Sequence, residues 1–240
     1  MPKPKYEPIY LSIKKDIEEG VYSFGDQLPS ENTYADRFDC TRNTVRRALN
    51  MLTNQGYIQP QHGKGVSVIY RKEDDRSIFT IGGIESFAET TQRNQKNVTT
   101  KVMKFQKVIC DERISEMTGF DEGNELYYIE RIRIIDGKAI IFDTNIYLAS
   151  ETPGLNEDIA VSSIYRYLEN ELKMTITTSK RRITAEKATE KDKEYLDLDE
   201  DIVLVVSGQV FNSKGIMFEY TQSRHRADSV CFVETASRVR

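Results

Sequence analysis

The segment from Thr41 to Gly56 restricts the possible folds of this chain more strongly than any other. Four apolar residues recur in it with the spacing of one helix face, namely Val45, Ala48, Leu49 and Leu52. The rest of the segment's polar surface carries hydroxyl, amide and guanidinium groups and no carboxylate: Thr41, Arg42, Asn43, Arg46, Arg47 and Asn50. With Thr41 as N-cap and Gly56 as terminator, we predict a helix over 42–54 that has one buried face and one polar, basic face.

A second predicted helix, 31–38, stands directly before it. Ser30 is a suitable N-cap for this helix, and Glu31 lies where the helix dipole favours an acid. Asp39 and Cys40 leave room only for a tight turn between the two helices. Two short helices joined in this way, the second polar and basic, form a helix-turn-helix. In such a unit arginine reads guanine and asparagine reads adenine, while threonine and arginine also bind phosphate.

The residues that flank this unit complete a small domain. An amphipathic helix is predicted over 6–19, because apolar residues recur there every three or four positions. Residues 57–68 read as two short strands around a tip with two glycines, His62-Gly63-Lys64-Gly65, which suits a wing that enters a minor groove. A phosphate-binding loop of the G-x-x-x-x-G-K-[ST] type is excluded, since Ile58 and Gly65 stand where glycine and a hydroxyl residue are required.

Charge is distributed unevenly along the chain. The net charge is −4 overall, but six basic and no acidic residues lie between positions 40 and 72. An acidic protein with one basic segment indicates a local surface for a polyanion, with the bulk of the chain kept away from it. A basic face that is merely solvated is the alternative, and charge alone does not decide between the two.

Composition excludes several other classes of protein. We expect a cytoplasmic chain, because the N-terminus lacks a signal peptide and no apolar run is long enough to span a membrane. Three scattered cysteines indicate reduced thiols, and no group of residues has metal-ligand spacing. An enzyme acting on sugar phosphates is a remote alternative, since two histidines, no nucleophile motif and no metal cluster leave little catalytic machinery. No catalytic residue and no cofactor are therefore assigned.

We predict an α+β chain with two domains: a winged helix-turn-helix domain at 1–70, a linker without apolar residues at 71–77, and an antiparallel-sheet domain at 78–240. Two hairpins support the sheet, one across Asp136-Gly137 and one across 212–215. A capping box is expected at Thr189–Asp192. In the second domain, helices are predicted at 86–93, 111–118, 163–173 and 189–196, and strands at 98–110, 125–135, 138–148, 174–184, 202–211, 216–223 and 229–236.

The ordered motifs Leu28-Pro29-Ser30-Glu31, 41–49, Gly56-Tyr57-Ile58 and 62–65 resemble those of the GntR family of regulators. Residues 78–240 resemble the effector-binding domain of its HutC subfamily, called UTRA and chorismate-lyase-like in fold. The matching stretches are 86–87, 130–133, 136–137, 163–165 and 219–226. Within that subfamily, the stretches 163–169, 223–228 and 232–233 are most similar to trehalose-operon repressors of Gram-positive bacteria.

The resemblance implies a homodimeric repressor that binds operator DNA and a small phosphorylated sugar, with trehalose 6-phosphate as the expected effector. Another sugar phosphate, such as an N-acetylglucosamine or glucosamine 6-phosphate, stays open as the alternative. By resemblance and from their chemistry, the residues expected at the DNA are Ser30, Asn32, Thr41, Arg42, Asn43, Thr44, Arg46, Arg47, His62, Gly63 and Lys64. For Ser30 a role as helix cap, and for Arg47 a phosphate contact or a solvated position, are at least as well supported.

The residues expected at the effector are Ser86, Arg131, Arg133, Asp143, Ser163, Tyr165, Glu219 and His225. Arg131 and Arg133 alternate on one strand and so point to one sheet face, where two guanidinium groups could clamp a phosphate. The alternative is two exposed arginines paired with acids. For Asp143 and Glu219, which lie in apolar strands, the alternatives are sugar hydroxyls as partners or a salt bridge across the sheet. Ser163 could be a phosphate ligand, a helix cap, or both.

Overall fold

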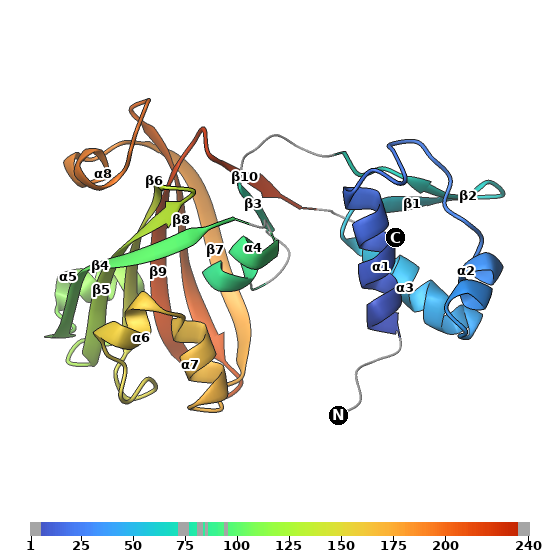
Figure 1. The fold of residues 1–240 in the computed structure, drawn as a ribbon. Helices are drawn as coiled ribbons and strands as arrows, with labels where there is room; N and C mark the ends of the chain where they lie inside the picture. The colour runs from blue at the N-terminus through green and yellow to red at the C-terminus, as the bar shows by residue number, and fades with distance from the viewer. Residues whose placement is uncertain (1–5, 72–76, 81–83, 85, 94–95, 235–240) are drawn as a thin grey trace. The chain divides into compact units, whose positions relative to one another are not determined.

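The computed structural model describes residues 6–71, 77–80, 84, 86–93 and 96–234, and these form two compact units (Figure 1). The first unit comprises the described residues up to 71 together with 233 and 234, and the second comprises the described residues from 77 to 232. Five of the seven residues of the predicted linker, 72–76, lie outside the described residues. We therefore describe each unit by itself.

The described part of the N-terminal unit contains three helices and a two-stranded hairpin: α1 Tyr6–Glu18, α2 Glu31–Arg37, α3 Arg42–Asn54, β1 Ile58–Gln61 and β2 Gly65–Val68. The apolar stripe of α3 is buried as predicted, and it packs against Ile13 of α1, Tyr34 of α2 and Ile58 of β1. A single core thus fixes α3 from three directions and leaves its polar face outward. The helix-turn-helix predicted from the sequence is confirmed.

The hairpin after α3 is antiparallel, with Ile58 opposite Val68 and Gln61 opposite Gly65. Its tip requires two left-handed residues, Gly63 with a φ of 72° and Gly65 with a φ of 95°. Only glycine adopts such angles without steric cost, so the two glycines determine the sharp turn of the wing.

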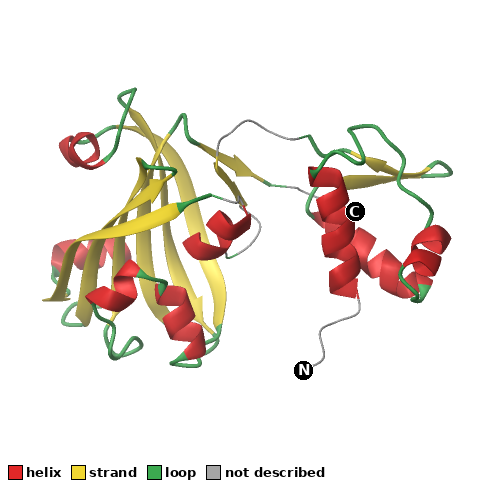
Figure 2. Cartoon of the chain, in the orientation of Figure 1, coloured by secondary structure: helices red, strands yellow, loops and turns green. Residues whose placement is uncertain are grey.

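The second unit is built on one antiparallel sheet of six strands in the order β4-β5-β6-β9-β8-β7 (Figures 1 and 2). A separate pair of strands, β10 and β3, lies beside it. The hairpins predicted across 136–137 and 212–215 are the connections β5–β6 and β8–β9. The strands are β3 Ser77–Thr80, β4 Val98–Ile109, β5 Glu125–Ile135, β6 Lys138–Leu148, β7 Ile176–Lys187, β8 Ile202–Asn212, β9 Met217–Arg226 and β10 Val230–Val233.

Among the described residues, five helices accompany this sheet: α4 Phe87–Arg93, α5 Glu112–Thr118, α6 Glu157–Val161, α7 Ile164–Asn170 and α8 Glu190–Tyr195. Helices α6 and α7 pack with Tyr147 of β6, whereas α5 packs with Ile146 of the same strand. Successive side chains of a strand point to opposite faces, so these helices cover opposite faces of the sheet. Helix α8 packs with Phe142 and thus lies on the same face as α5.

Strand β3 and helix α6 were not predicted, and several strand ends differ. Strand β3 begins at Ser77, which the sequence analysis assigned to the linker. Helix α6 has only five residues, too few for a periodic pattern to be read. Strand β7 runs to Lys187 rather than 184 and β9 to Arg226 rather than 223, while β10 stops at Val233. The predicted end of that last strand, Ala236, lies outside the described residues.

Candidate DNA-binding surface and effector cavity

Two hydroxyl groups hold the ends of the helix-turn-helix. Ser30 accepts a hydrogen bond from the backbone of Thr33 at 3.2 Å, and Thr41 accepts one from Thr44 at 3.4 Å. Each hydroxyl therefore caps a helix, as the sequence suggested for both. The turn between the helices contains Asp39 in the left-handed region, with a φ of 47°.

The basic face of α3 contains an acid that comes from outside the helix. Glu31, the first residue of α2, accepts hydrogen bonds from Arg46 Nε at 3.0 Å, from Arg46 Nη2 at 2.8 Å and from Arg42 Nη2 at 3.3 Å. The hydrogen bond from Arg46 lowers the pKa of the Glu31 carboxyl below its usual value. This carboxylate was not predicted on the basic surface, because it comes from α2 and is absent from the sequence pattern of α3.

The other predicted DNA-contact residues are distributed over the same unit. Arg47 stacks on the ring of Tyr6, with 4.1 Å from its Cζ to the ring centroid, and so leans toward α1. Asn32 and Asn43 are exposed, and Thr44 is half-buried beside its cap. His62, Gly63 and Lys64 are exposed at the tip of the wing. The structure thus leaves the amides and the wing tip accessible to a partner.

The second unit contains a cavity of about 590 Å³. All eight residues predicted for the effector line it: Ser86, Arg131, Arg133, Asp143, Ser163, Tyr165, Glu219 and His225. They come from the start of α4, from strands β5, β6 and β9, and from the start of α7. Residues that are up to 139 positions apart in the chain, Ser86 and His225, therefore meet at one site.

Within this cavity, the guanidinium of Arg133 contacts a carboxylate, a hydroxyl and an aromatic ring. Its Nε donates to Asp143 at 2.8 Å and its Nη1 to Thr100 at 2.7 Å, and its guanidinium lies 4.6 Å from the ring centroid of Phe87. Burial, together with the neighbouring Arg131, lowers the pKa of Arg133 to about 10, so the group stays charged at neutral pH. A salt bridge with an acid, one of the two alternatives, is thus present, but it is buried and not exposed.

Arg131 differs from Arg133 because no carboxylate binds it directly among the described residues. Its Nη2 donates to Asn145 at 2.6 Å and its Nη1 to the carbonyl of Ala160 at 3.2 Å. Its buried Nε has no hydrogen-bond partner in the described part of the chain. A buried guanidinium donor without a partner favours a site at which an anionic ligand binds.

Glu219 lies beside Arg131 and accepts three hydrogen bonds. Tyr147 donates to Oε1 at 2.8 Å, Asn145 to the same oxygen at 3.1 Å, and Tyr165 to Oε2 at 2.8 Å. Burial raises the pKa of the Glu219 carboxyl, against the lowering effect of these donors. Tyr165 is therefore engaged by Glu219 here. Ser163 caps α7 by accepting from the backbone of Arg166 at 3.3 Å.

Asp143 bridges β5 and β9. It accepts from Arg133 and, at 2.6 Å, from the hydroxyl of Ser223. Of the two alternatives for this carboxylate, the salt bridge across the sheet is the one that the structure shows, and sugar hydroxyls remain a proposal. Burial opposes its ionisation, but the two arginines keep the pKa of Asp143 below its usual value.

His225 lies at the aromatic end of the cavity. Its ring contacts Phe79 of β3 and Phe232 of β10 edge to face, each at 5.4 Å between centroids. Burial lowers the pKa of the imidazole, which makes the neutral form dominant at neutral pH. Its neighbour Arg226 does not line the cavity and instead pairs with Asp228 and Asp199.

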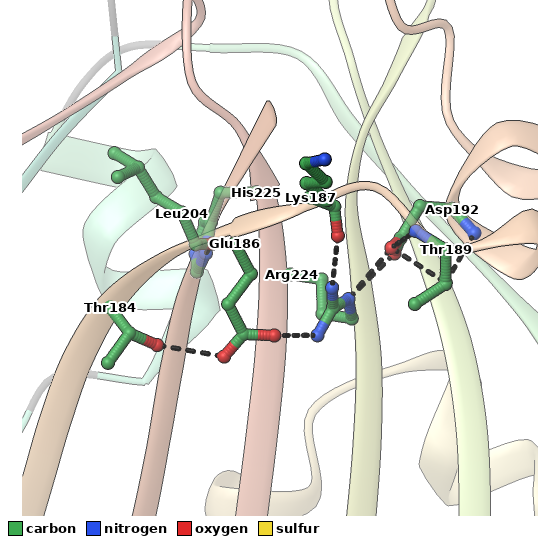
Figure 3. Close-up of polar contacts among 8 residues, drawn as sticks. All are labelled: Thr184, Glu186, Lys187, Thr189, Asp192, Leu204, Arg224 and His225. Carbon is green, nitrogen blue, oxygen red and sulfur yellow. Dashed lines mark hydrogen bonds and ion pairs between the residues drawn. The ribbon is translucent and has the colours of Figure 1, made fainter. Parts of the chain in front are cut away.

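The opposite face of β9 carries a different network (Figure 3). Arg224 Nε donates to both oxygens of the fully buried Asp192, each at 2.9 Å, and its Nη1 donates to Glu186 at 2.9 Å. Asp192 also accepts from the backbone and hydroxyl of Thr189, each at 2.7 Å, which confirms the predicted capping box of α8. This network ties α8 to the sheet and lies away from the cavity.

Several lining residues were missed by the sequence analysis. Asn145 and Tyr147 follow Asp143 at intervals of two, so the alternation of β6 could have placed them on the cavity face. Phe79 and Phe232 come from β3 and β10, which pair although they lie far apart in the chain, and Thr100 of β4 lies opposite Arg133 of β5. No pattern around these three residues in the sequence indicates that they meet the cavity.

In the described part of the chain, no group of three or more histidine, cysteine, aspartate or glutamate residues is arranged to hold a metal ion. Among the described helices, none combines the length and apolar character of a membrane span.

Comparisons with known proteins agree with this arrangement. Residues 5–68 match the model of bacterial regulatory proteins of the gntR family, and residues 93–230 match the UTRA domain. The HTH-type transcriptional regulator TreR of Bacillus subtilis is 36% identical over 98% of each chain. The crystal structure of the possible regulator YydK from Bacillus subtilis aligns with a TM-score of 0.80 and 25% identity over 97% of this chain and 99% of that one.

A third comparison concerns the second unit. The solved effector binding domain of the Bacillus subtilis trehalose repressor is 35% identical, with a TM-score of 0.55 over 59% of this chain and 99% of that one. Neither matching family is a family of enzymes. The chain therefore belongs to the HutC subfamily of the GntR family, as a DNA-binding transcriptional regulator with a C-terminal UTRA domain.

Proposed function

We propose that this chain is a cytoplasmic, homodimeric repressor of a trehalose-utilisation operon that leaves its operator when trehalose 6-phosphate binds. The observation that carries the proposal is the pair of buried arginines in the UTRA cavity, of which Arg131 retains an unpartnered Nε. The similarity to TreR and to the solved effector domain of a trehalose repressor supports the choice of sugar.

The chemistry of the cavity supports a phosphorylated sugar. Arg131 and Arg133 provide charged donors, and Ser86 and Ser163 provide hydroxyls near the start of two helices. Carboxylates are suitable partners for sugar hydroxyls, and Asp143 and Glu219 line the same space. Its volume of about 590 Å³ lies within the range that small-molecule sites occupy, roughly 300–1,000 Å³.

We further propose that the DNA half of the protein reads a pseudo-palindromic operator. The exposed Asn32, Asn43, Arg42 and Arg46 offer base-reading groups, and the tip residues His62, Gly63 and Lys64 suit a minor groove. A symmetric dimer would place its two α3 helices in successive major grooves, about 34 Å apart. Ser30 and Thr41 would then act mainly through the helices that they cap.

The alternative effector is another sugar phosphate, such as glucosamine 6-phosphate or N-acetylglucosamine 6-phosphate. Arginine recognises the phosphate and is indifferent to the sugar, so the guanidinium pair supports both candidates equally. The polar groups at Asp143 and Glu219 and the aromatic end at Phe79, His225 and Phe232 would make the distinction.

Thermal unfolding with a panel of sugar phosphates tests the proposal. Ligand at one hundred times its Kd should stabilise the protein by about 2.7 kcal/mol. We expect a shift with trehalose 6-phosphate, and none with trehalose or glucosamine 6-phosphate. In R131Q the shift should be lost, whereas R113Q, at an exposed arginine of α5, should retain it. A shift with a different sugar phosphate alone would overturn the trehalose assignment while leaving the phosphate site in place.

A further inference from the structure

Glu31 of α2 accepts hydrogen bonds from two arginines of α3, Arg42 and Arg46. We propose that Glu31 is a positioning residue that fixes the Arg46 guanidinium in the orientation from which it reads a guanine. The inference rests on the proposed operator binding. It adds a residue that neither the predicted DNA contacts nor the family comparisons assign.

The geometry of the contact is that of a fork. Both carboxylate oxygens of Glu31 accept from Arg46, one from Nε at 3.0 Å and the other from Nη2 at 2.8 Å. Such bidentate pairing fixes the plane of the guanidinium as well as its position. It occupies two of the five N–H donors of arginine. The other edge, formed by Nη1 and the second hydrogen of Nη2, is not used by Glu31, and a pair of donors of this kind can bind O6 and N7 of guanine.

The exposed fractions of the three side chains show that Glu31 is the more fixed partner in these ion pairs. The side chain of Glu31 is 25% exposed, whereas those of Arg46 and Arg42 are 53% and 60% exposed. The carboxylate therefore stands on the body of the domain, at the capped start of α2, and the arginines extend over it. Arg42 and Arg46 lie one turn apart on α3, and both reach the same acid.

Two opposite effects on DNA binding follow from such an acid. A carboxylate near the phosphates repels DNA, so if charge alone mattered, its removal would tighten the binding of any sequence. A carboxylate that orders an arginine instead lowers the entropy lost on binding, which is worth roughly two- to tenfold in affinity for each ordered side chain. The ordering of Arg46 affects binding only through the base that Arg46 contacts, whereas charge repulsion acts on DNA of any sequence. This difference distinguishes the two effects.

The experiment begins with an operator that the full-length wild-type protein selects from a pool of randomised DNA duplexes. Each guanine of that operator is then replaced singly by 7-deazaguanine, which lacks the N7 acceptor and keeps Watson–Crick pairing. At one guanine in each half-site, we expect the wild type to lose about tenfold in affinity, because the hydrogen bond to N7 is lost and only that to O6 remains of the bidentate contact. R46A should show no further loss at that guanine.

The decisive variant is E31A, with E19A as a control that removes one exposed carboxylate from the same unit. We expect E31A to bind the operator about tenfold more weakly, with a 7-deazaguanine penalty below about threefold, because Arg46 is no longer oriented. E19A should keep the full penalty, and E31Q, which retains one acceptor, should fall between. E31A should bind unrelated DNA at least as well as E19A does.

Three results would overturn the proposal. The first is that E31A loses as much affinity as the wild type does when the guanine is replaced by 7-deazaguanine. The second is that E31A binds the operator more tightly while this loss is unchanged. The third is that the loss persists in R46A. If E31A fails to fold in a thermal unfolding control, E31Q alone decides by the same measurement. A wild type that selects no sequence would contradict the proposed operator binding itself, which is a different failure.

Discussion

Arg131 and Arg133 lie two positions apart on one strand and yet have different surroundings. Arg133 is neutralised by Asp143 and held by Thr100, whereas Arg131 has only neutral acceptors and an unpartnered Nε. Arg133 therefore contributes to the stability of the sheet through its contacts with Asp143 and Thr100. Arg131 is the one whose full hydrogen bonding requires a ligand.

This difference predicts different responses to the same substitution. R133Q leaves the buried Asp143 without its counter-ion, and we expect the free energy of unfolding to fall by about 3 kcal/mol. R131Q breaks no ion pair with a bonded carboxylate and should cost less. Urea denaturation without ligand measures both, with R113Q as the exposed control. The double variant R133Q/D143N should recover much of the loss, and failure to do so would contradict a role for the ion pair.

At the level of elements, local sequence signals predicted most of what the structure shows. Helix α3 and strands β5 and β6 begin and end at the predicted residues, because capping residues, Gly56 and the turn at 136–137 define those boundaries. The predicted end of β7 was too early, because it is an edge strand with both faces largely exposed and so lacks an alternating pattern.

The same reasoning explains how much of the site was predictable. Alternation along β5 indicated that Arg131 and Arg133 share a face, and the structure places both in the cavity. The roles of Glu31 and Phe79 could not be predicted, since each depends on a partner from another element: the arginines of α3 in one case and His225 of β9 in the other. Sequence periodicity describes one element at a time and does not report which elements meet.

The pairing of β7 with β8 requires a glycine at position 208. A Cβ added at Gly208 of β8 would lie 2.6 Å from the carbonyl oxygen of Lys180 on β7, which is too close for any unshifted backbone. We expect G208A to destabilise the protein by about 2 kcal/mol, and to weaken ligand binding, because Ser179 and Arg181 of β7 line the cavity. Thermal unfolding and ligand titration measure these effects. S207A should change neither, and a neutral G208A would show that β7 moves aside without cost.

At the scale of the whole molecule, the two units must influence each other if the proposed induction is correct. Thermodynamic linkage requires that operator DNA weaken effector binding by the same factor by which the effector weakens operator binding. Couplings of this kind usually amount to about 5- to 150-fold. Calorimetric titration of trehalose 6-phosphate, with and without saturating operator, measures this factor. Equal effector affinity in the two titrations would refute the induction model.

The alternation of strand β9 has a consequence for how proteins of this kind diverge. Glu219, Ser223 and His225 face the cavity, while Tyr220 and Arg224 face the packed side under α5 and α8. Changes at every second position can therefore alter the ligand without disturbing the residues that stabilise the sheet. On this one strand, recognition and stability are carried by different side chains: a substitution on the cavity side changes the chemistry offered to a ligand, while Tyr220 and Arg224 keep their contacts on the other side.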